Sequence, residues 1–189
     1  MSEKLKMLAG KPYNPFDKEL LKLRVNARKL TEAFNTTSIS KLSNRKKLLK
    51  QLFGRAGENL FIEPNFQCDY GVNIHLGENF YANYNCVILD AAEVKIGDNC
   101  FIGPQVGIYT SSHPIEPSPR NQGVQFAKAI NIGDNCWIGG HASILPGVSI
   151  GHNVVIAAGA VVTKSFSDNV VLAGNPARIV KHIKDVETE

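Results

Sequence analysis

The stretch that decides the predicted fold is IGDNCWIGGHASILPGVSIGHNVVIAAGAVVTK, residues 132–164. Its aliphatic residues recur every six positions without a break: Ile132, Ile138, Ile144, Ile150, Ile156 and Val162. Small or modest residues follow four positions after most of them: Cys136, Ala142, Val148, Val154 and Ala160. This period differs from the roughly 3.6 of an amphipathic helix and the roughly 2 of a half-buried strand. It is typical of a β-helix, in which each repeat forms one side of a triangular coil and its aliphatic residue points inward.

The composition is that of an ordinary globular protein. The chain has 189 residues, of which 43% are hydrophobic and 20% charged, and its net charge is +4. The densest basic cluster, NRKKLLK at 44–50, is typical of a solvated helix face, so no nucleic-acid partner is predicted. The start lacks the layout of a signal peptide, and no apolar run approaches the roughly 18 residues that a spanning helix needs. We therefore expect a cytoplasmic protein with no membrane partner.

The cysteines follow the repeat. Cys100 and Cys136 both come after the string IGDN, at the small inward position, and Cys86 holds the same position after Ala82. Together with Cys68 they are predicted to be buried free thiols rather than disulfides, metal ligands or nucleophiles. Free thiols agree with a cytoplasmic location.

Residues 1–58 are predicted to form a helical segment that packs on a β-helix domain of residues 59–189. Asn14 is expected to cap a helix, with Pro15 at its first position and Asp17 in its first turn. This helix should run to about residue 35 and bury a set of apolar residues: Leu20, Leu21, Val25, Ala27 and Leu30. A second helix is expected over 45–53, ended by Gly54.

Two breaks interrupt the six-residue period. Ile88 and Ile96 stand eight residues apart, so two residues of LDAAEV are expected to bulge outward. The larger break is residues 110–129, which contain three prolines and show no periodicity. A loop of this length inside a compact solenoid is usually functional. We expect the chemistry at these breaks and at the coil edges beside them.

The repeats occur together with four further segments: KMLAGKPYNPFD (6–17), CDYGVNIHLGENFYANYNCVILD (68–90), YTSSHPIEPSPRNQG (109–123) and VVTKSFSDNVVLAGNPARIV (161–180). In this order they resemble bacterial sugar O-acetyltransferases, closest to the maltose acetyltransferase type, with galactoside and nodulation-factor acetyltransferases as cousins. The resemblance implies a left-handed parallel β-helix and a homotrimer with active sites between subunits. It also implies acetyl transfer from acetyl-CoA to a sugar hydroxyl, with no metal.

An alcohol attacks a thioester poorly unless its proton is removed as it attacks. An imidazole, with an ordinary pKa near ~6.5, can accept that proton at neutral pH. His113 lies in the long loop and matches the family's catalytic histidine in SSHP, so the resemblance implies that it is the general base. His75, His141 and His152 are interpreted as surface residues of the coils.

Polar residues at matching positions are implied to bind the acceptor: Asp69 and Asn83, with Tyr81 as a ring partner, and also Asp90 and Asp17. Asn83 could also stabilise the oxyanion of the thioester carbonyl. Galactoside-type relatives carry an acidic residue directly after the position of Asp90, where this chain has Ala91. A glucose- or maltose-like acceptor is therefore favoured over a galactoside.

Acetyl-CoA needs a groove for its pantetheine arm and cations for its phosphates. The resemblance implies that the groove is lined by Gly140, Ala158, Thr163 and Lys164, and that Arg178 and Lys181 meet the phosphate oxygens.

Three other functions stay open. A hexapeptide-repeat acetyltransferase could act on serine, an amino sugar or an antibiotic, although such enzymes lack the KMLAGKPYNPFD opening. A zinc enzyme of the carbonic anhydrase type needs a histidine cluster, and His113 has no histidine partner within its loop. A non-enzymatic assembly platform would not depend on His113.

Overall fold

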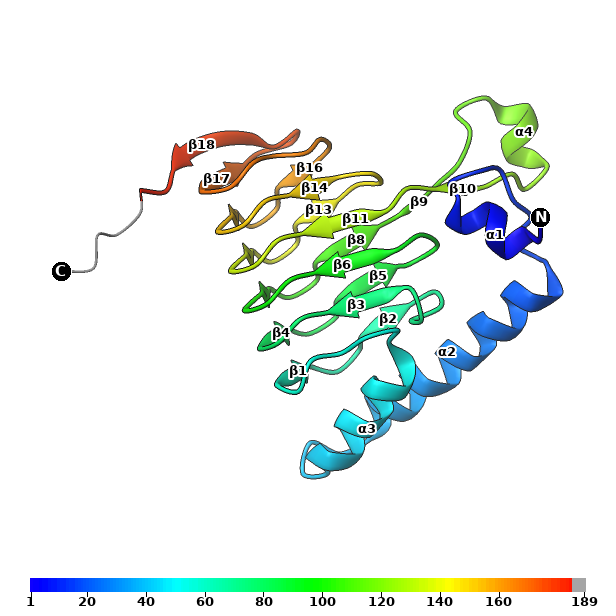
Figure 1. Cartoon of the computed structure of the whole chain (residues 1–189), viewed down its shortest axis with the longest axis horizontal. Helices are drawn as coiled ribbons and strands as arrows, with labels where there is room; N and C mark the ends of the chain where they lie inside the picture. The colour runs from blue at the N-terminus through cyan, green and yellow to red at the C-terminus, as the bar shows by residue number, and fades with distance from the viewer. Residues whose placement is uncertain (185–189) are drawn as a thin grey trace.

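The chain winds into a triangular column of stacked coils, described by a computed structural model over residues 1–184 (Figure 1). Each coil gives one short strand to each of three sheets, and strands of successive coils pair in parallel. The mainly β, parallel β-helix prediction is confirmed. Residues 185–189, which end the predicted C-terminal tail, lie outside the described residues. No helix within residues 1–184 is long and apolar enough to cross a membrane.

The strands are distributed over the three sides as follows. The seven-stranded sheet contains β1 (Leu60–Ile62), β4 (Phe80–Ala82), β7 (Phe101–Ile102), β12 (Trp137–Ile138), β15 (Val155–Ile156), β17 (Val170–Ala173) and the antiparallel β18 (Arg178–His182). The five-stranded sheet contains β2 (Gln67–Cys68), β5 (Val87–Leu89), β8 (Gly107–Tyr109), β13 (Ser143–Ile144) and β16 (Val161–Val162). The four-stranded sheet contains β3 (Ile74–Leu76), β6 (Val94–Ile96), β11 (Ile130–Ile132) and β14 (Ser149–Ile150).

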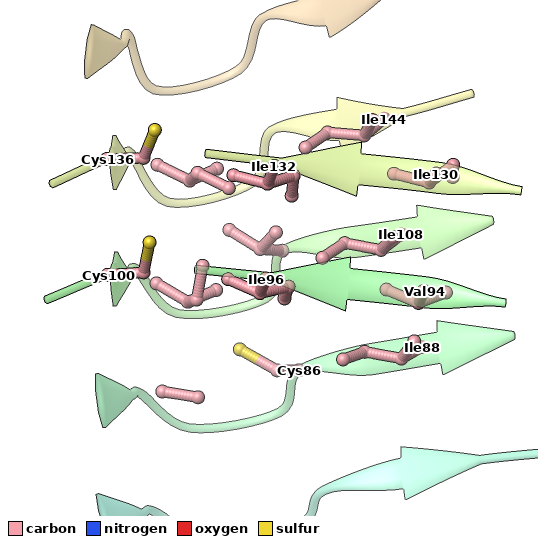
Figure 2. Packing of buried hydrophobic residues seen from close by; sticks show 14 of the residues in the cluster. Cys86, Ile88, Val94, Ile96, Cys100, Ile108, Ile130, Ile132, Cys136 and Ile144 are labelled. Atoms are coloured by element: carbon pink, nitrogen blue, oxygen red, sulfur yellow. The ribbon is translucent and has the colours of Figure 1, made fainter. Parts of the chain in front are cut away.

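The six-residue period forms the core of the column. All six aliphatic residues that define the period between positions 132 and 162 are buried. The four cysteines are buried and free, as predicted, and Figure 2 shows Cys100 and Cys136 at the same place in successive coils. Trp137 points outward and is 58% exposed. Alternation between inward and outward positions along each short strand therefore holds through the stack.

The helical segment closes the first end of the column and contains α1 (Glu3–Leu8), α2 (Lys18–Thr36) and α3 (Leu42–Leu52). The predicted start of α2 is wrong: Asp17 is the N-cap, and its Oδ1 accepts the N–H groups of Glu19 and Leu20. Asn14 instead accepts the Phe16 N–H in the turn before it.

The buried face of α2 also differs from the prediction. Leu20 and Ala27 are buried as expected, and Phe34 joins them, whereas Leu21 and Val25 are exposed. A helix presents only one stripe of about 100° or more to the core, so neighbouring positions turn away from it.

Side chains of this segment satisfy backbone groups of the first coil. Asn35 donates to the Phe66 carbonyl at 2.9 Å and accepts the Phe66 N–H at 3.1 Å. Arg45 belongs to the basic cluster expected to be solvated, but it is 4% exposed and donates to the carbonyls of Phe34, Thr37 and Ile62. The helices therefore close the end of the column by hydrogen bonding as well as by apolar contact.

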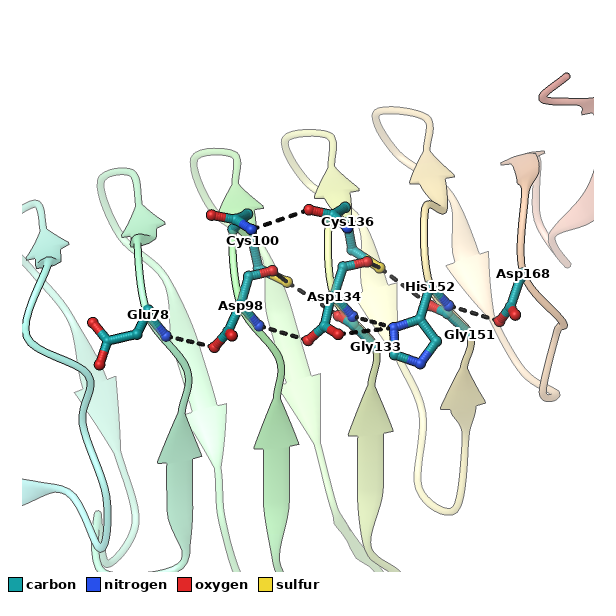
Figure 3. A network of polar contacts seen from close by, with 11 residues as sticks. Glu78, Asp98, Cys100, Gly133, Asp134, Cys136, Gly151, His152 and Asp168 are labelled. Atoms are coloured by element: carbon teal, nitrogen blue, oxygen red, sulfur yellow. Dashed lines mark hydrogen bonds and ion pairs between the residues drawn. The ribbon is translucent and has the colours of Figure 1, made fainter. Parts of the chain in front are cut away.

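A polar ladder runs along the corner between the four-stranded and seven-stranded sheets (Figure 3). The side-chain oxygen of Asp98 accepts the Glu78 N–H at 2.7 Å, and that of Asp134 accepts the Asp98 N–H at 2.8 Å. Asn99, with φ of 55°, donates to the Asn135 amide one coil further at 3.1 Å. Asn tolerates this left-handed conformation better than most residues, which explains its recurrence at the corner.

The corner between the five-stranded and four-stranded sheets holds every large break in the period. We call residues 69–73, 90–93 and 110–129 the irregular corner, because they lie between corresponding strands of three successive coils. Residues 110–129 contain β9 (Ser111–Ser112), α4 (Pro117–Asn121) and β10 (Phe126–Ala127), with β9 and β10 antiparallel.

The expected outward bulge between Ile88 and Ile96 is wrong. Asp90, Ala91 and Ala92 are buried, at 0%, 1% and 3% exposure. Ala91 and Ala92 pack in a second apolar cluster that joins the N-terminal segment to the irregular corner: Met7, Tyr13, Leu20, Tyr70, Ala91, Ala92 and Ala127. The N-terminal segment thus covers the irregular corner.

Inward and outward side chains alternate along β6, so two neighbouring substitutions can test which positions of the repeat face the core. Ile96→Ala should lower the free energy of unfolding by about 2–4 kcal/mol, because Ile96 is 3% exposed and its truncation leaves a cavity between coils. Lys95→Ala, one residue earlier and outward, should change it by less than about 0.5 kcal/mol. Urea unfolding at one fixed protein concentration measures both; equal losses would contradict the inward assignment of the repeat.

Candidate functional site

A cavity of about 280 Å³ lies between the irregular corner and the N-terminal segment. Two of the predicted residues, Asp69 and His113, line it together. The other lining residues are Tyr13, Pro15, Phe16, Arg24, Arg28, Leu89, Ser111 and Gln125. Segments far apart in the sequence therefore meet at one place, with a carboxyl group, an imidazole and two guanidinium groups around it.

His113 follows β9, and the β9–β10 pairing holds the returning strand beside it. Its Nδ1 lies 3.3 Å from the Val124 carbonyl oxygen. Its Nε2 lies 3.2 Å from Nε2 of Gln125. Both ring nitrogens are thus placed by the returning strand, and the ring lines the cavity.

The backbone of Asp69 is held in place by a second carboxyl group, that of Asp90. Asp90 is completely buried, and its Oδ1 accepts the N–H groups of Asp69 and Tyr70 at 3.0 and 2.8 Å. Its Oδ2 accepts the Asn73 N–H at 3.3 Å. Asp90 was predicted to contact the acceptor, but in the structure its side-chain oxygens accept from backbone donors at the irregular corner, and it is not among the residues that line the cavity.

Burial dominates the titration of this pair. It raises the pKa of Asp90 to about 6, with the charge of Asp69 adding to the shift and the backbone donors opposing it. Burial also raises the pKa of Asp69, while Arg24 and Arg28 act in the opposite direction. The cavity wall therefore contains a carboxyl group whose charge depends on two nearby cations.

Sequence reasoning did not find Arg24 and Arg28. Arg24 donates to the Tyr70 hydroxyl at 2.8 Å, its guanidinium lies 5.3 Å from the centre of the Tyr70 ring, and its buried Nε has no partner among the described residues. The two arginines stand four positions apart on α2, so they share a helix face. Asp69 was already a predicted site residue, and the N-terminal helix was expected to pack on the β-helix. Two arginines four positions apart on that helix were the signal that could have identified them.

Other predicted acceptor residues lie elsewhere. Asp17 caps α2 and does not line the cavity. Tyr81 and Asn83 line a different depression of about 440 Å³ on the seven-stranded sheet, beside Phe101 and Trp137. The Asn83 Oδ1 accepts the Tyr84 N–H at 2.8 Å, which leaves the Nδ2 donors for a ligand. Within one chain, Asn83 and His113 are therefore not brought together.

The residues predicted for acetyl-CoA form separate groups. Gly140 and Ala158 belong to adjacent turns, and the Gly140 carbonyl accepts the N–H of Gly159. A Cβ on Gly139 would lie 2.5 Å from the Ala158 nitrogen, so this edge requires glycine. The remaining predicted residues are exposed: Thr163 and Lys164 follow β16, and Arg178 and Lys181 lie on β18. Within residues 1–184, no three His, Cys, Asp or Glu side chains form a group that could hold a metal ion.

Three family descriptions match parts of the chain. "Maltose acetyltransferase hexapeptide capping motif" matches residues 6–57, "Bacterial transferase hexapeptide (six repeats)" residues 129–164, and "Hexapeptide repeat of succinyl-transferase" residues 93–112.

Similarity to individual proteins extends over nearly the whole chain. A maltose O-acetyltransferase from Clostridium difficile 630 superposes with a TM-score of 0.97 at 49% identity, covering 98% of this chain and 99% of that one. A galactoside O-acetyltransferase from Escherichia coli K12 is 42% identical, covering 98% and 90%. A hexapeptide-repeat acetyltransferase from Vibrio cholerae in complex with acetyl-CoA has a TM-score of 0.90 at 35% identity, covering 98% and 100%.

The raised pKa of Asp90 predicts a pH-dependent stability. Because the folded pKa of about 6 exceeds the unfolded value, the contribution of this group is complete below about pH 4 and is lost as the pH rises through about 6. Asp90→Asn lacks this titration but leaves backbone donors poorly paired, which costs about 1–3 kcal/mol at every pH.

The difference in unfolding free energy between wild type and Asp90→Asn should therefore shrink by about 2–3 kcal/mol between pH 4 and pH 7. Denaturant titrations at several pH values measure it. A difference that stays constant over this range would show that Asp90 does not titrate there.

Proposed function

Because the chain belongs to the maltose and galactoside O-acetyltransferase family and is an acyltransferase that uses acetyl-CoA, we propose that it acetylates a sugar hydroxyl with His113 as general base. The observation that carries the proposal is the cavity in which His113 and Asp69 meet Arg24 and Arg28. A polar, partly enclosed cavity with a histidine in its wall suits a small polyhydroxylated acceptor.

The proposed reaction is a direct transfer. The unprotonated Nε2 of His113 accepts the proton of the acceptor hydroxyl while its oxygen attacks the thioester carbonyl. The carbon–sulfur bond then breaks, and the imidazolium returns the proton to the CoA sulfur. General base catalysis of this kind contributes roughly 10²–10⁴-fold.

Three side chains at the cavity suit the binding of sugar hydroxyl groups. The Asp69 carboxylate can accept hydrogen bonds from two hydroxyls, and the guanidinium groups of Arg24 and Arg28 can donate to sugar oxygens. Arg24 also donates to the Tyr70 hydroxyl at 2.8 Å, which fixes its guanidinium at the cavity wall. We therefore add Arg24 and Arg28 to the proposed acceptor residues.

We propose a glucose- or maltose-like acceptor in preference to a galactoside. Position 91 carries alanine, which is buried in the second apolar cluster, in place of the acidic residue of galactoside-type members. The similarity to the maltose O-acetyltransferase, at 49% identity, is also greater than that to the galactoside enzyme, at 42%.

The edge that bears Gly140 and Ala158 is proposed to bind the pantetheine arm. Small residues there leave backbone groups open to an extended ligand, and both positions are partly or fully exposed. Lys164, Arg178 and Lys181 are exposed cations suited to the phosphates.

We propose that each site is completed by a neighbouring copy in a homotrimer. An aromatic stripe runs along the outside of the seven-stranded sheet: Phe61, Tyr81, Phe101 and Trp137. Phe101 and Trp137 are 54% and 58% exposed, and exposed apolar stripes of this kind mark contact surfaces. Seating this sheet beside a neighbour's irregular corner would bring Asn83, as oxyanion donor, to the neighbour's His113.

His113→Ala should lower the turnover of acetyl-CoA with a responsive sugar by about 10²–10⁴-fold, because the base is lost. CoA release measured with a panel of sugars, serine and amine acceptors tests this. His75→Ala, on the four-stranded sheet, is the matched control and should keep the wild-type rate. Full activity of His113→Ala would overturn the base assignment, and a response to amines or serine alone would overturn the sugar acceptor.

Mixed oligomers test the shared site. His113→Ala and Asn83→Ala should each be nearly inactive alone. Co-expressed chains should regain up to about one quarter of wild-type activity. In randomly mixed trimers, about one quarter of the shared sites combine an intact His113 with an intact Asn83 of the neighbouring chain. No recovery in verified mixed trimers would place both groups in one subunit's site or remove Asn83 from the mechanism.

A further inference from the structure

A chain of hydrogen bonds joins the N-terminal segment to His113. The Tyr13 hydroxyl donates to Oε1 of Gln125 at 3.1 Å, and the Tyr13 N–H donates to the Gln125 carbonyl at 3.0 Å. The other end of the Gln125 amide, Nε2, lies 3.2 Å from Nε2 of His113. Tyr13 is 4% exposed, so Gln125 is held at two points by a buried residue.

These contacts select one tautomer of His113. The Val124 carbonyl can only accept, so it favours a proton on the Nδ1 that faces it, although at 3.3 Å this contact is long for a hydrogen bond and does not fix the tautomer alone. In the neutral ring Nε2 is then bare and must accept a hydrogen bond. The Gln125 amide must therefore present its NH₂ group to the ring and its oxygen to Tyr13, which is the arrangement observed.

We propose that Gln125, fixed by Tyr13, is a positioning residue that holds His113 in the tautomer with a bare Nε2 directed at the acceptor. This inference rests on the proposed function, because it concerns the same base. The Gln125 NH₂ group occupies the place from which an acceptor hydroxyl must donate. The hydroxyl replaces the amide at Nε2 when the acceptor binds.

The two hydrogen bonds of the amide explain why glutamine suits this position. An apolar side chain would leave Nε2 without a donor before the acceptor arrives. A carboxylate would only accept, and would favour a protonated Nε2 that cannot act as a base. The other titratable or charged groups that line the cavity with His113 are Tyr13, Arg24, Arg28 and Asp69.

Three variants test the inference. Gln125→Met removes the donor at similar size and should reduce kcat by about ten-fold or more, on the scale of other histidine-orienting contacts. Gln125→Glu should move the acidic limb of the kcat/KM profile to higher pH by about one unit or more, with activity partly regained in alkali. Gln122→Met, exposed on the same loop and outside the cavity, is the matched control and should match wild type.

A direct readout separates this inference from the proposed function. In protein with ¹⁵N-labelled histidine, the ring nitrogen shifts of His113, assigned with His113→Ala, should show a proton on Nδ1 in wild type. In Gln125→Met they should show a mixture of tautomers, and Tyr13→Phe should shift part of the population the same way. An unchanged tautomer and an unchanged pH profile in Gln125→Met would overturn the positioning role. An active His113→Ala would overturn the base assignment while leaving the tautomer result intact.

Discussion

The structure depends on one constraint: each coil must return the backbone to the register of the coil before it. The N–H and C=O groups of one strand pair with the strands on either side, so an extra residue within a strand would leave buried groups unpaired. Insertions are tolerated only where the chain turns between sheets. All three large departures lie at one of the corners, and their stacking there creates a cavity that the regular prism lacks.

The extra residues at this corner have backbone groups that no neighbouring strand pairs with. Side chains form hydrogen bonds with these groups instead. Asp90 accepts three N–H groups of the preceding coil, and the Thr110 hydroxyl donates to the Leu89 carbonyl and accepts the Ala92 N–H. The N-terminal segment then packs against the corner and contributes Arg24, Arg28 and Tyr13 to the cavity. The cavity proposed for the acceptor is therefore built by non-repetitive sequence, whereas the repeats supply a rigid frame and the edge proposed for acetyl-CoA.

The period of six predicted the column, its buried cysteines and the places where it breaks, because inward positions depend only on local spacing. The loop at 110–129 was also predicted, since a long aperiodic insertion is visible without a structure, whereas the assignment of His113 as base came from the family resemblance and stays a prediction. The start of α2, the burial of Arg45, the backbone contacts of Asp90 and the positions of Arg24 and Gln125 were not predicted. Each depends on which backbone groups come together from distant segments, and a single sequence does not contain that information. Asn83 was predicted for the site of His113, yet the two line different depressions of one chain.

The two ends of the column are closed by different means. At the first coil, Asn35 and Arg45 occupy backbone groups that another strand could otherwise pair with. At the last coil the chain reverses, and β18 lies antiparallel on β17 with Arg178, Lys181 and His182 along the outer strand. A parallel β-helix with open ends is a template for end-to-end polymerisation into fibres. The charged, antiparallel β18 blocks parallel pairing at one end of the column, and the N-terminal helices block it at the other. A second molecule is therefore prevented from extending the column.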